Sequence, residues 1–166
     1  DGEHLGNVTG SGDISGLPRE TAEQMFLESE RFVSRFARDG WLGVCGFDFF
    51  HDERSGKLYM TECNGRVTAL TYAVGIVQQV KERLRGECSV AMRNIRPPRE
   101  LAHPHLIRRK LERLLFDGTR GAIPMNLRCL TLPQPKFTVA CVAATSVEAE
   151  AQLAEVRTRL SCSLQG

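Results

Sequence analysis

The sequence lacks the features that mark several common classes of protein. Its apolar stretches fall well short of the roughly 20 residues that a membrane-spanning helix requires. Its 22 basic and 20 acidic side chains are interspersed and leave a net charge of only +2. The basic footprint of a nucleic-acid-binding protein is therefore missing. We expect neither a membrane nor a nucleic acid as a partner.

The six cysteines include no Cys-x-x-Cys pair, and most of them lie in apolar, strand-like runs where cysteine behaves as a small hydrophobic residue. We interpret them as reduced thiols, which indicates a cytoplasmic location. One alternative stays open for Cys45 and Cys63, which fall on the same face of a predicted hairpin and could form a disulfide or share a metal ion.

Signatures of nucleophilic catalysis and of the common nucleotide-binding loops are also missing. The sequence has no Gly-x-Ser-x-Gly, no P-loop and no dinucleotide fingerprint. None of the four histidines has the partners expected of a general base, and only His4 is expected near a functional cleft. These patterns identify no active site.

Two strand-like runs, residues 43–50 and 57–66, carry the most informative residues of the chain. The polar connection between them ends in Gly56, which predicts a β-hairpin with a three-residue loop at residues 54–56. Antiparallel partners keep a constant sum of residue numbers, so this loop sets the register. The predicted pairs are Asp48 with Glu62, Gly46 with Asn64, Phe50 with Met60 and Glu53 with Lys57.

This register places three oxygen-bearing side chains, Asp48, Glu62 and Asn64, on one face of the hairpin. Two carboxylates directly opposite one another destabilise a sheet, so the arrangement favours a bound cation. Carboxylate and amide oxygens prefer Mg²⁺ or Mn²⁺ to zinc. The other face should pack into the core and carries Phe47, Phe49, Tyr59, Thr61 and Cys63. A one-residue slip would instead leave Asp48 on the surface, with Glu62 paired to Arg66 or a lysine.

Alternating helical and strand patterns predict an α+β fold, and the composition, 42% hydrophobic and 25% charged, is that of an ordinary globular protein. Residues 18–39 and 68–85 have helical periodicity and are each followed by a glycine. We expect the first helix to pack on the sheet. The second begins just after Arg66, with Thr68 as its cap, so its N–H groups and dipole would face a phosphate.

Beyond residue 86 the pattern changes, and we divide the chain into domains 1–86 and 87–166. The second domain should contain strands 89–95, 121–127 and 136–145 and helices 104–116 and 146–160. The basic residues around Arg109 are interpreted as the solvated face of a helix.

The spacing Gly43-x-x-Gly46-x-Asp48, followed by Tyr59-x-x-Glu62-x-Asn64-x-Arg66, resembles the C-terminal half of the ATP-grasp catalytic domain. The first motif is more similar to peptide ligases of the pheganomycin type than to the D-alanine ligase branch, which has an arginine at the position of Gly46. The resemblance implies an antiparallel sheet flanked by helices, followed by a small α/β C-terminal appendage.

The resemblance also implies a function: ATP-dependent ligation of a small-molecule carboxylate to an amine, forming a peptide bond through an acyl phosphate. The implied cofactors are ATP and Mg²⁺ or Mn²⁺. Asp48, Glu62 and Asn64 would bind the metal. Arg66, Asn64 and Thr68 would contact the nucleotide, with Arg66 also acting in catalysis.

A complete ligase of this kind needs a preceding half with a glycine-rich lid and phosphate-binding lysines, which this sequence does not show. We therefore expect a fragment that is inactive alone. Two rivals stay open, namely a non-catalytic ATP-grasp remnant acting as a binding or assembly module and a magnesium-dependent nuclease. A nuclease usually carries lysine where this chain has Asn64. A homo-oligomer is left open.

Overall fold

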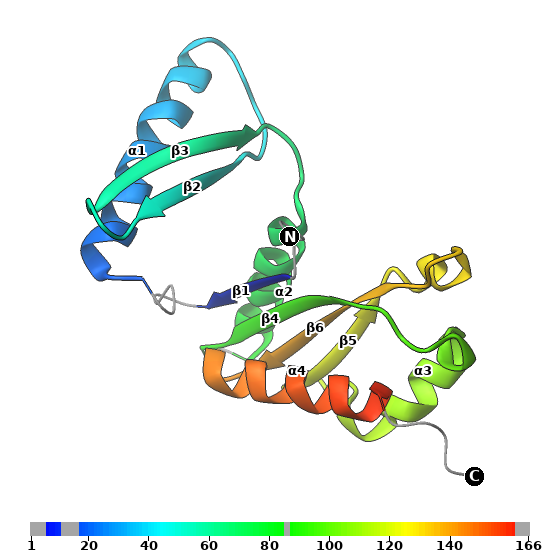
Figure 1. Cartoon of the computed structure of the whole chain (residues 1–166). Helices are drawn as coiled ribbons and strands as arrows, with labels where there is room; N and C mark the ends of the chain where they lie inside the picture. The colour runs from blue at the N-terminus through cyan, green and yellow to red at the C-terminus, as the bar shows by residue number, and fades with distance from the viewer. Residues whose placement is uncertain (1–5, 11–16, 85–86, 162–166) are drawn as a thin grey trace. The chain divides into compact units, whose positions relative to one another are not determined.

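The computed structural model describes residues 6–10, 17–84 and 87–161. Within these ranges the chain is α+β, as the sequence predicts, with four α-helices and two antiparallel sheets (Figure 1). The described residues fall into two compact units. Residues 17–71 form the hairpin unit, and residues 6–10 with 72–161 form the sheet unit. No helix in the described ranges is long and apolar enough to cross a bilayer.

The sheet unit is built on a four-stranded sheet in which all neighbouring strands are antiparallel. The strand order is β1 (Gly6–Gly10), β4 (Ser89–Ile95), β6 (Phe137–Ala143) and β5 (Gly121–Met125). The two central strands, β4 and β6, are almost continuously buried. This is the pattern expected of strands covered on both faces.

Helices cover both faces of this sheet. On one face α2 (Ala69–Leu84) buries a stripe formed by Ala73, Val77 and Val80. On the other face lie α3 (Pro104–Leu111) and α4 (Ser146–Ser161). Figure 1 shows α4 running along the sheet beside β4 and β6. The larger core cluster on this side includes Ile107, Leu111, Phe137, Val139, Leu153 and Val156.

The expected elements of the C-terminal region are confirmed to within a few residues. A capping box begins α4: the Thr145 N–H donates to Glu148 Oε2 at 3.1 Å, and the Glu148 N–H donates to Thr145 Oγ1 at 3.2 Å. The predicted helix 104–116 is shorter than expected, since α3 gives way to a 3₁₀ turn at Glu112–Leu114. Further 3₁₀ turns lie at Arg99–Leu101 and Leu127–Thr131.

The hairpin unit consists of α1 (Arg19–Arg38) and a two-stranded sheet of β2 (Gly46–Asp52) and β3 (Lys57–Asn64). The predicted stop of α1 at Gly40 is confirmed. Gly40 has φ +85° and donates its N–H to Ala37 O at 3.1 Å, while the Trp41 N–H donates to Phe36 O at 2.9 Å. This is a Schellman motif, and the left-handed position explains why glycine stands there.

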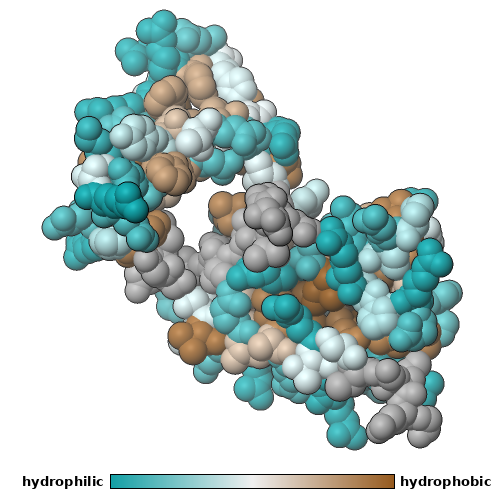
Figure 2. Space-filling view, in the orientation of Figure 1, coloured by the Kyte–Doolittle hydropathy of each residue, from teal (hydrophilic) through white to brown (hydrophobic). Residues whose placement is uncertain are grey.

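Aromatic rings connect α1 to the hairpin. Phe32 lies between Phe36 and Phe47, with ring centroids 6.3 and 6.0 Å apart, and Phe36 also contacts Trp41 at 6.1 Å. These contacts confirm that α1 packs on the hairpin sheet. The further expectation that it packs into a core is wrong for the described residues, because α1 has no buried side chain and Phe26 is 69% exposed. Two strands offer too little surface to cover its apolar stripe. Apolar side chains (brown) accordingly reach the surface of the hairpin unit in Figure 2.

The division into units differs from the sequence-based division at residue 86. α2 follows the hairpin in the chain, yet its buried stripe packs on the sheet of the other unit, so residues from Tyr72 onward are grouped with the C-terminal region. The compact units of the structure therefore meet after Thr71, whereas the sequence-based domains meet after residue 86. The domains 1–86 and 87–166 stay a prediction.

Candidate functional site

The register of the hairpin brings Asp48 directly opposite Glu62, and Gly46 opposite Asn64. The predicted pairs at these positions are confirmed, but the loop length and the pairs next to the loop differ from the prediction. The loop has four residues, 53–56, and not three, so Asp52 pairs with Lys57 and Phe50 pairs with Tyr59. The predicted pairs Phe50 with Met60 and Glu53 with Lys57 are therefore wrong.

A β-bulge restores the register near the candidate site. The pairing shifts between Asp48 and Phe49, and Thr61 is the extra residue on β3. The Thr61 hydroxyl donates to the carbonyl oxygen of Asp48 at 3.1 Å, which ties the bulge to the opposite strand. The longer loop shifts the pairing by one residue, and the bulge shifts it back by one. From Asp48 to Gly46 the register is therefore the predicted one.

The bulge also changes which residues share a face. Tyr59 and Thr61 are exposed, contrary to the expectation that they pack into the core, and the Tyr59 ring lies 6.5 Å from that of exposed Phe50. Cys63, also expected in the core, is exposed as well. The large apolar side chains that are half-buried on the two strands are Phe47, Phe49, Leu58 and Met60.

The candidate metal ligands are close together and open to solvent. Asn64 Nδ2 donates to Asp48 Oδ2 at 3.4 Å, a long hydrogen bond, and the Asp48 and Glu62 side chains are exposed. Directly opposite residues of an antiparallel pair have Cβ atoms about 5 Å apart. Asp48 and Glu62 therefore face the same side of the sheet, with the Asn64 amide beside them.

Thr68, also in the hairpin unit, lies close to this end of the hairpin. A Cβ on Gly46 would point to the Asp48 side of β2, and the nearest atom to it is Thr68 Cγ2, at 3.7 Å. Thr68 precedes α2, and its N–H is accepted by the Thr71 hydroxyl at 3.0 Å, as in a capping box. The Thr71 N–H donates to the carbonyl oxygen of Thr68 at 3.1 Å, and the two hydroxyl oxygens lie 3.4 Å apart, so side-chain capping by Thr68 stays a prediction. The Thr68 side chain lies next to the end of the hairpin that carries Asn64.

Arg66, the predicted catalytic residue, lies in the turn between β3 and α2. Its N–H donates to Asn64 O at 2.8 Å, so the turn leaves β3 directly after Asn64. Its exposed guanidinium donates through Nη1 to Val67 O at 3.4 Å. The chain thus holds Arg66 near the candidate ligands, while its side chain makes a local contact. The predicted cleft residue His4 lies outside the described residues.

The cysteines in the described ranges are free thiols, as predicted: Cys45, Cys63, Cys88, Cys129 and Cys141. Burial and, secondly, the neighbouring Cys63 thiol raise the pKa of Cys45. The Cys45 and Cys63 thiols are therefore neighbours, although no disulfide joins them. Burial raises the pKa of Cys141 to about 12, which fits a cysteine that acts as core filler.

No group of three or more histidine, cysteine, aspartate or glutamate side chains converges in the described part of the chain. The candidate centre has only two such residues and depends on the Asn64 amide for its third oxygen. Mg²⁺ sites commonly use one or two carboxylates and keep several waters or phosphate oxygens, so a small protein ligand set suits this ion.

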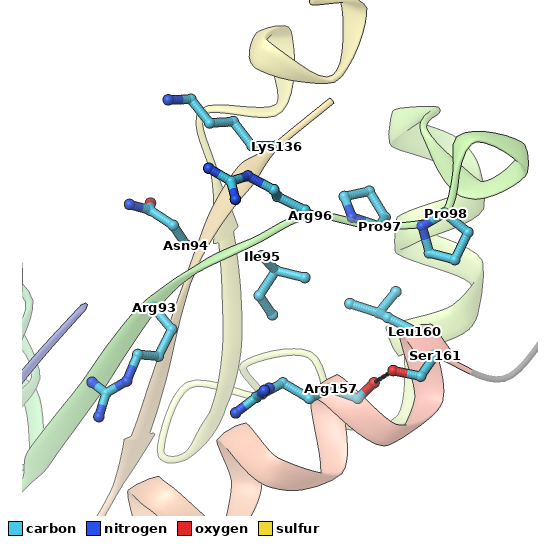
Figure 3. Close-up of a pocket in the computed structure, with 10 residues that line it drawn as sticks. All are labelled: Arg93, Asn94, Ile95, Arg96, Pro97, Pro98, Lys136, Arg157, Leu160 and Ser161. Carbon is cyan, nitrogen blue, oxygen red and sulfur yellow. Dashed lines mark hydrogen bonds between the residues drawn. The ribbon is translucent and has the colours of Figure 1, made fainter. Parts of the chain in front are cut away.

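Sequence reasoning missed a second site, a groove of about 720 Å³ in the sheet unit. Its cationic residues are Arg93, Arg96, Lys136 and Arg157. They come from β4, the segment after it, the residue before β6, and α4, so only the folded topology places them around one groove (Figure 3). The sequence offered no signal for them beyond their charge.

The chain has no match among protein-family models, curated proteins or solved structures.

Proposed function

We propose that this chain supplies the metal-binding part of an ATP-dependent carboxylate–amine ligase of the ATP-grasp type, which forms a peptide bond through an acyl phosphate. The observation that carries the proposal is the pairing of Asp48 opposite Glu62 with the Asn64 amide 3.4 Å from Asp48. The motif spacing that resembles the ATP-grasp domain supports the same conclusion. The proposed substrates are ATP, a small-molecule carboxylate and an amine.

The chemistry of the ligand set fits Mg²⁺ or Mn²⁺. Both carboxylates are exposed and directly opposite, so they repel one another until a cation neutralises them. Asn64 adds an amide oxygen, and the oxygen and nitrogen of an amide can exchange places by rotation. All three ligands are hard oxygens, which favour these ions over zinc.

The remaining residues would act on the phosphates. A divalent ion held by Asp48, Glu62 and Asn64 would offset the charge that accumulates when a carboxylate and ATP are brought together. Arg66 would contact the transferring phosphoryl group from the turn after β3. Thr68 directly precedes α2, so the unpaired N–H groups at the start of that helix would interact with the same anions. Ligation of this kind needs no protein nucleophile, which agrees with the lack of such a signature.

The metal site is tested by titrating the chain with Mn²⁺ and measuring the free ion by electron paramagnetic resonance. Asp48→Asn should weaken Mn²⁺ binding by about tenfold or more, because a charged ligand is lost. Glu53→Gln is the matched control: it removes the same charge from the same hairpin, in the exposed loop away from the site, and should leave binding unchanged. Equal weakening in both variants would show a diffuse charge effect instead of a site.

The activity is tested on the full-length protein by measuring phosphate release from ATP in the presence of mixed carboxylates and amines. Turnover should require Mg²⁺, a carboxylate and an amine, and Asp48→Asn should lower it by orders of magnitude while the fold is retained. Metal binding without any turnover would favour a non-catalytic binding module. Cleavage of DNA or RNA by this chain would favour a nuclease.

A further inference from the structure

Two thiols meet at the end of the hairpin opposite its loop. Cys63 lies in β3 and pairs with Phe47 across the ladder, and Cys45 stands two residues before Phe47 in the chain. Side chains two residues apart along an extended strand share a face. Burial, then the charge of Cys63 and then a hydrogen bond with the Cys63 side chain raise the pKa of Cys45. The two thiols are therefore in contact, and both are free.

The two thiols differ in how accessible they are. Cys63 is exposed, and Cys45 is half-buried. Of the other described cysteines, Cys88 and Cys141 are buried in the sheet unit, and Cys129 is half-buried there. A reagent in solution therefore reaches Cys63 directly, and Cys45 is the thiol that lies beside it.

The backbone at Cys45 allows a covalent bond to Cys63. Residues diagonal to one another in an antiparallel pair lie about 7 Å apart, which is near the upper limit of about 6.8 Å between the Cα atoms of a disulfide. The strand ladder begins with Gly46 opposite Asn64, so Cys45 lies just outside it. The small shift that closes a disulfide therefore disturbs no ladder pair.

A shared metal ion suits this pair less well than a disulfide. Structural zinc sites use four protein ligands, and catalytic zinc sites use three. In the ranges that the structure describes, no group of three or more histidine, cysteine, aspartate or glutamate side chains converges. Two thiols are sufficient for a disulfide, but they supply only part of a zinc site.

We propose that Cys45 and Cys63 form a reversible oxidation site, which closes to a disulfide by exchange with a small-molecule disulfide. The Cys63 sulfur loses its proton and attacks one sulfur of the reagent, and one small thiolate leaves. The Cys45 sulfur then loses its proton and attacks the Cys63 sulfur, and the second small thiolate leaves. Two protein thiols and one small disulfide thus become one protein disulfide and two small thiols, so the reagent is reduced and the protein is oxidised.

The disulfide acts in the unit that has the least internal packing. No described side chain of the hairpin unit is buried. A bond between Cys45 and Cys63 closes a loop that contains the hairpin, and such a bond stabilises a fold mainly by restricting the unfolded chain. Cys63 lies between Glu62 and Asn64 in β3, so the bond restrains the end of the hairpin that carries these residues. The oxidation site does not depend on the proposed ligase activity.

The test incubates the intact chain with glutathione disulfide, blocks the remaining thiols and maps the disulfides by peptide mass spectrometry. The expected product joins the peptide that contains Cys45 to the peptide that contains Cys63, and excess reduced glutathione should reverse it. Amide exchange in β2 and β3 should slow by about tenfold or more on oxidation, as expected for a bond that closes a loop of this size.

Two variants separate the steps and control for the loss of a thiol. Cys45→Ser removes the second step, so Cys63 should remain as a mixed disulfide with glutathione and amide exchange should not slow. Cys129→Ser is the matched control, because it removes a half-buried thiol from the other unit. It should leave the bond between Cys45 and Cys63 unchanged.

Three results would overturn the proposal. The first is a wild-type chain that forms only mixed disulfides with glutathione. The second is a chain in which Cys63 is joined mainly to a cysteine other than Cys45. The third is equimolar Zn²⁺ that binds the reduced chain and prevents the bond, which would favour a shared metal ion instead.

Discussion

Every side chain found to be buried belongs to the sheet unit, between Ala73 and Leu160, whereas no described side chain of the hairpin unit is buried. The sheet unit has helices on both faces of four strands, while the hairpin unit has one helix beside two strands. An isolated two-stranded sheet is only marginally stable in water. The residues proposed to bind metal therefore lie in the unit with the smaller core.

The buried core, which stabilises the fold, and the residues proposed to bind metal therefore lie in different units. Asp48 and Glu62 remain in water, so the hairpin carries two opposed carboxylates without the large cost of burying a charge. Regions with few buried contacts open more easily than cores, and binding sites are often drawn from them. Occupation of the site by a cation would stabilise the hairpin unit, and the gain in free energy would grow with the logarithm of the cation concentration divided by its Kd.

The largest expected effect comes from truncating matched phenylalanines in the two units. Phe137→Ala in β6 removes a side chain that is 1% exposed and should lower the free energy of unfolding by about 3–5 kcal/mol. Phe26→Ala in α1 removes one that is 69% exposed and should cost less than about 0.5 kcal/mol. Urea unfolding followed by far-ultraviolet circular dichroism measures both. Similar costs would mean that α1 is covered in solution.

Two glycines should respond to alanine with opposite signs. Gly40→Ala forces a side chain into a backbone with φ +85° and should destabilise the end of α1 by about 1 kcal/mol. Gly75→Ala lies within α2 with no atom near its added methyl group, and it should stabilise the helix by about 0.5–1 kcal/mol. Hydrogen exchange of the amides in α1 and α2 measures each effect locally. A stabilising Gly40→Ala would contradict the Schellman geometry.

The opposed carboxylates give a smaller effect whose sign depends on metal. Without divalent ions, Glu62→Gln should stabilise the hairpin by about 0.2–1 kcal/mol, because it removes a like charge directly opposite Asp48. With Mn²⁺ the order should reverse, since only the wild-type hairpin binds the ion. Amide exchange in β2 and β3, with and without Mn²⁺, makes the measurement. The interpretation fails if Mn²⁺ protects both chains equally.

The regular elements could be predicted because local patterns determine them. The apolar periodicity of residues 146–160 and the Thr145 and Glu148 spacing place α4 correctly, and Gly40 marks the end of α1. The exposure of α1 could not be predicted in this way. Periodicity shows that a helix has an apolar face, but it does not show how much surface is present to cover that face.

The candidate site shows the same limit at the level of register. The sequence predicts Asp48 opposite Glu62 with a three-residue loop, whereas the structure has a four-residue loop and a bulge at Thr61 that compensates for the extra residue. A bulge leaves little trace in the sequence, because Thr61 suits a regular strand as well. The basic groove could not be foreseen, since Lys136 and Arg157 are placed around it only by the packing of α4 beside β4 and β6.

The smallest expected effect is on the pKa of one aspartate in each unit, Asp117 and Asp52, each of which accepts hydrogen bonds within a turn. Backbone N–H groups of Arg120 and Thr119, together with the Thr119 hydroxyl, donate to Asp117 and lower its pKa to about 2. In the hairpin unit, the Ser55 hydroxyl and then the Arg54 N–H lower the pKa of Asp52. Because both pKa values lie below the ordinary 3.8, each turn is stabilised above that pH and loses the contribution as the pH falls through the folded-state pKa.

The two turns should differ in how much they depend on one hydroxyl. Ser55 is the largest cause of the lowered pKa at Asp52, whereas the Thr119 hydroxyl adds to two backbone donors at Asp117. Ser55→Ala removes the largest cause and should therefore raise the pKa of Asp52 toward its ordinary value, whereas Thr119→Ala should leave the pKa of Asp117 still clearly lowered. Titration of the side-chain carboxyl carbons by nuclear magnetic resonance measures both. If Thr119→Ala restored an ordinary pKa at Asp117, the backbone donors would not hold that turn, and the sheet unit would rely on side-chain contacts as much as the hairpin unit does.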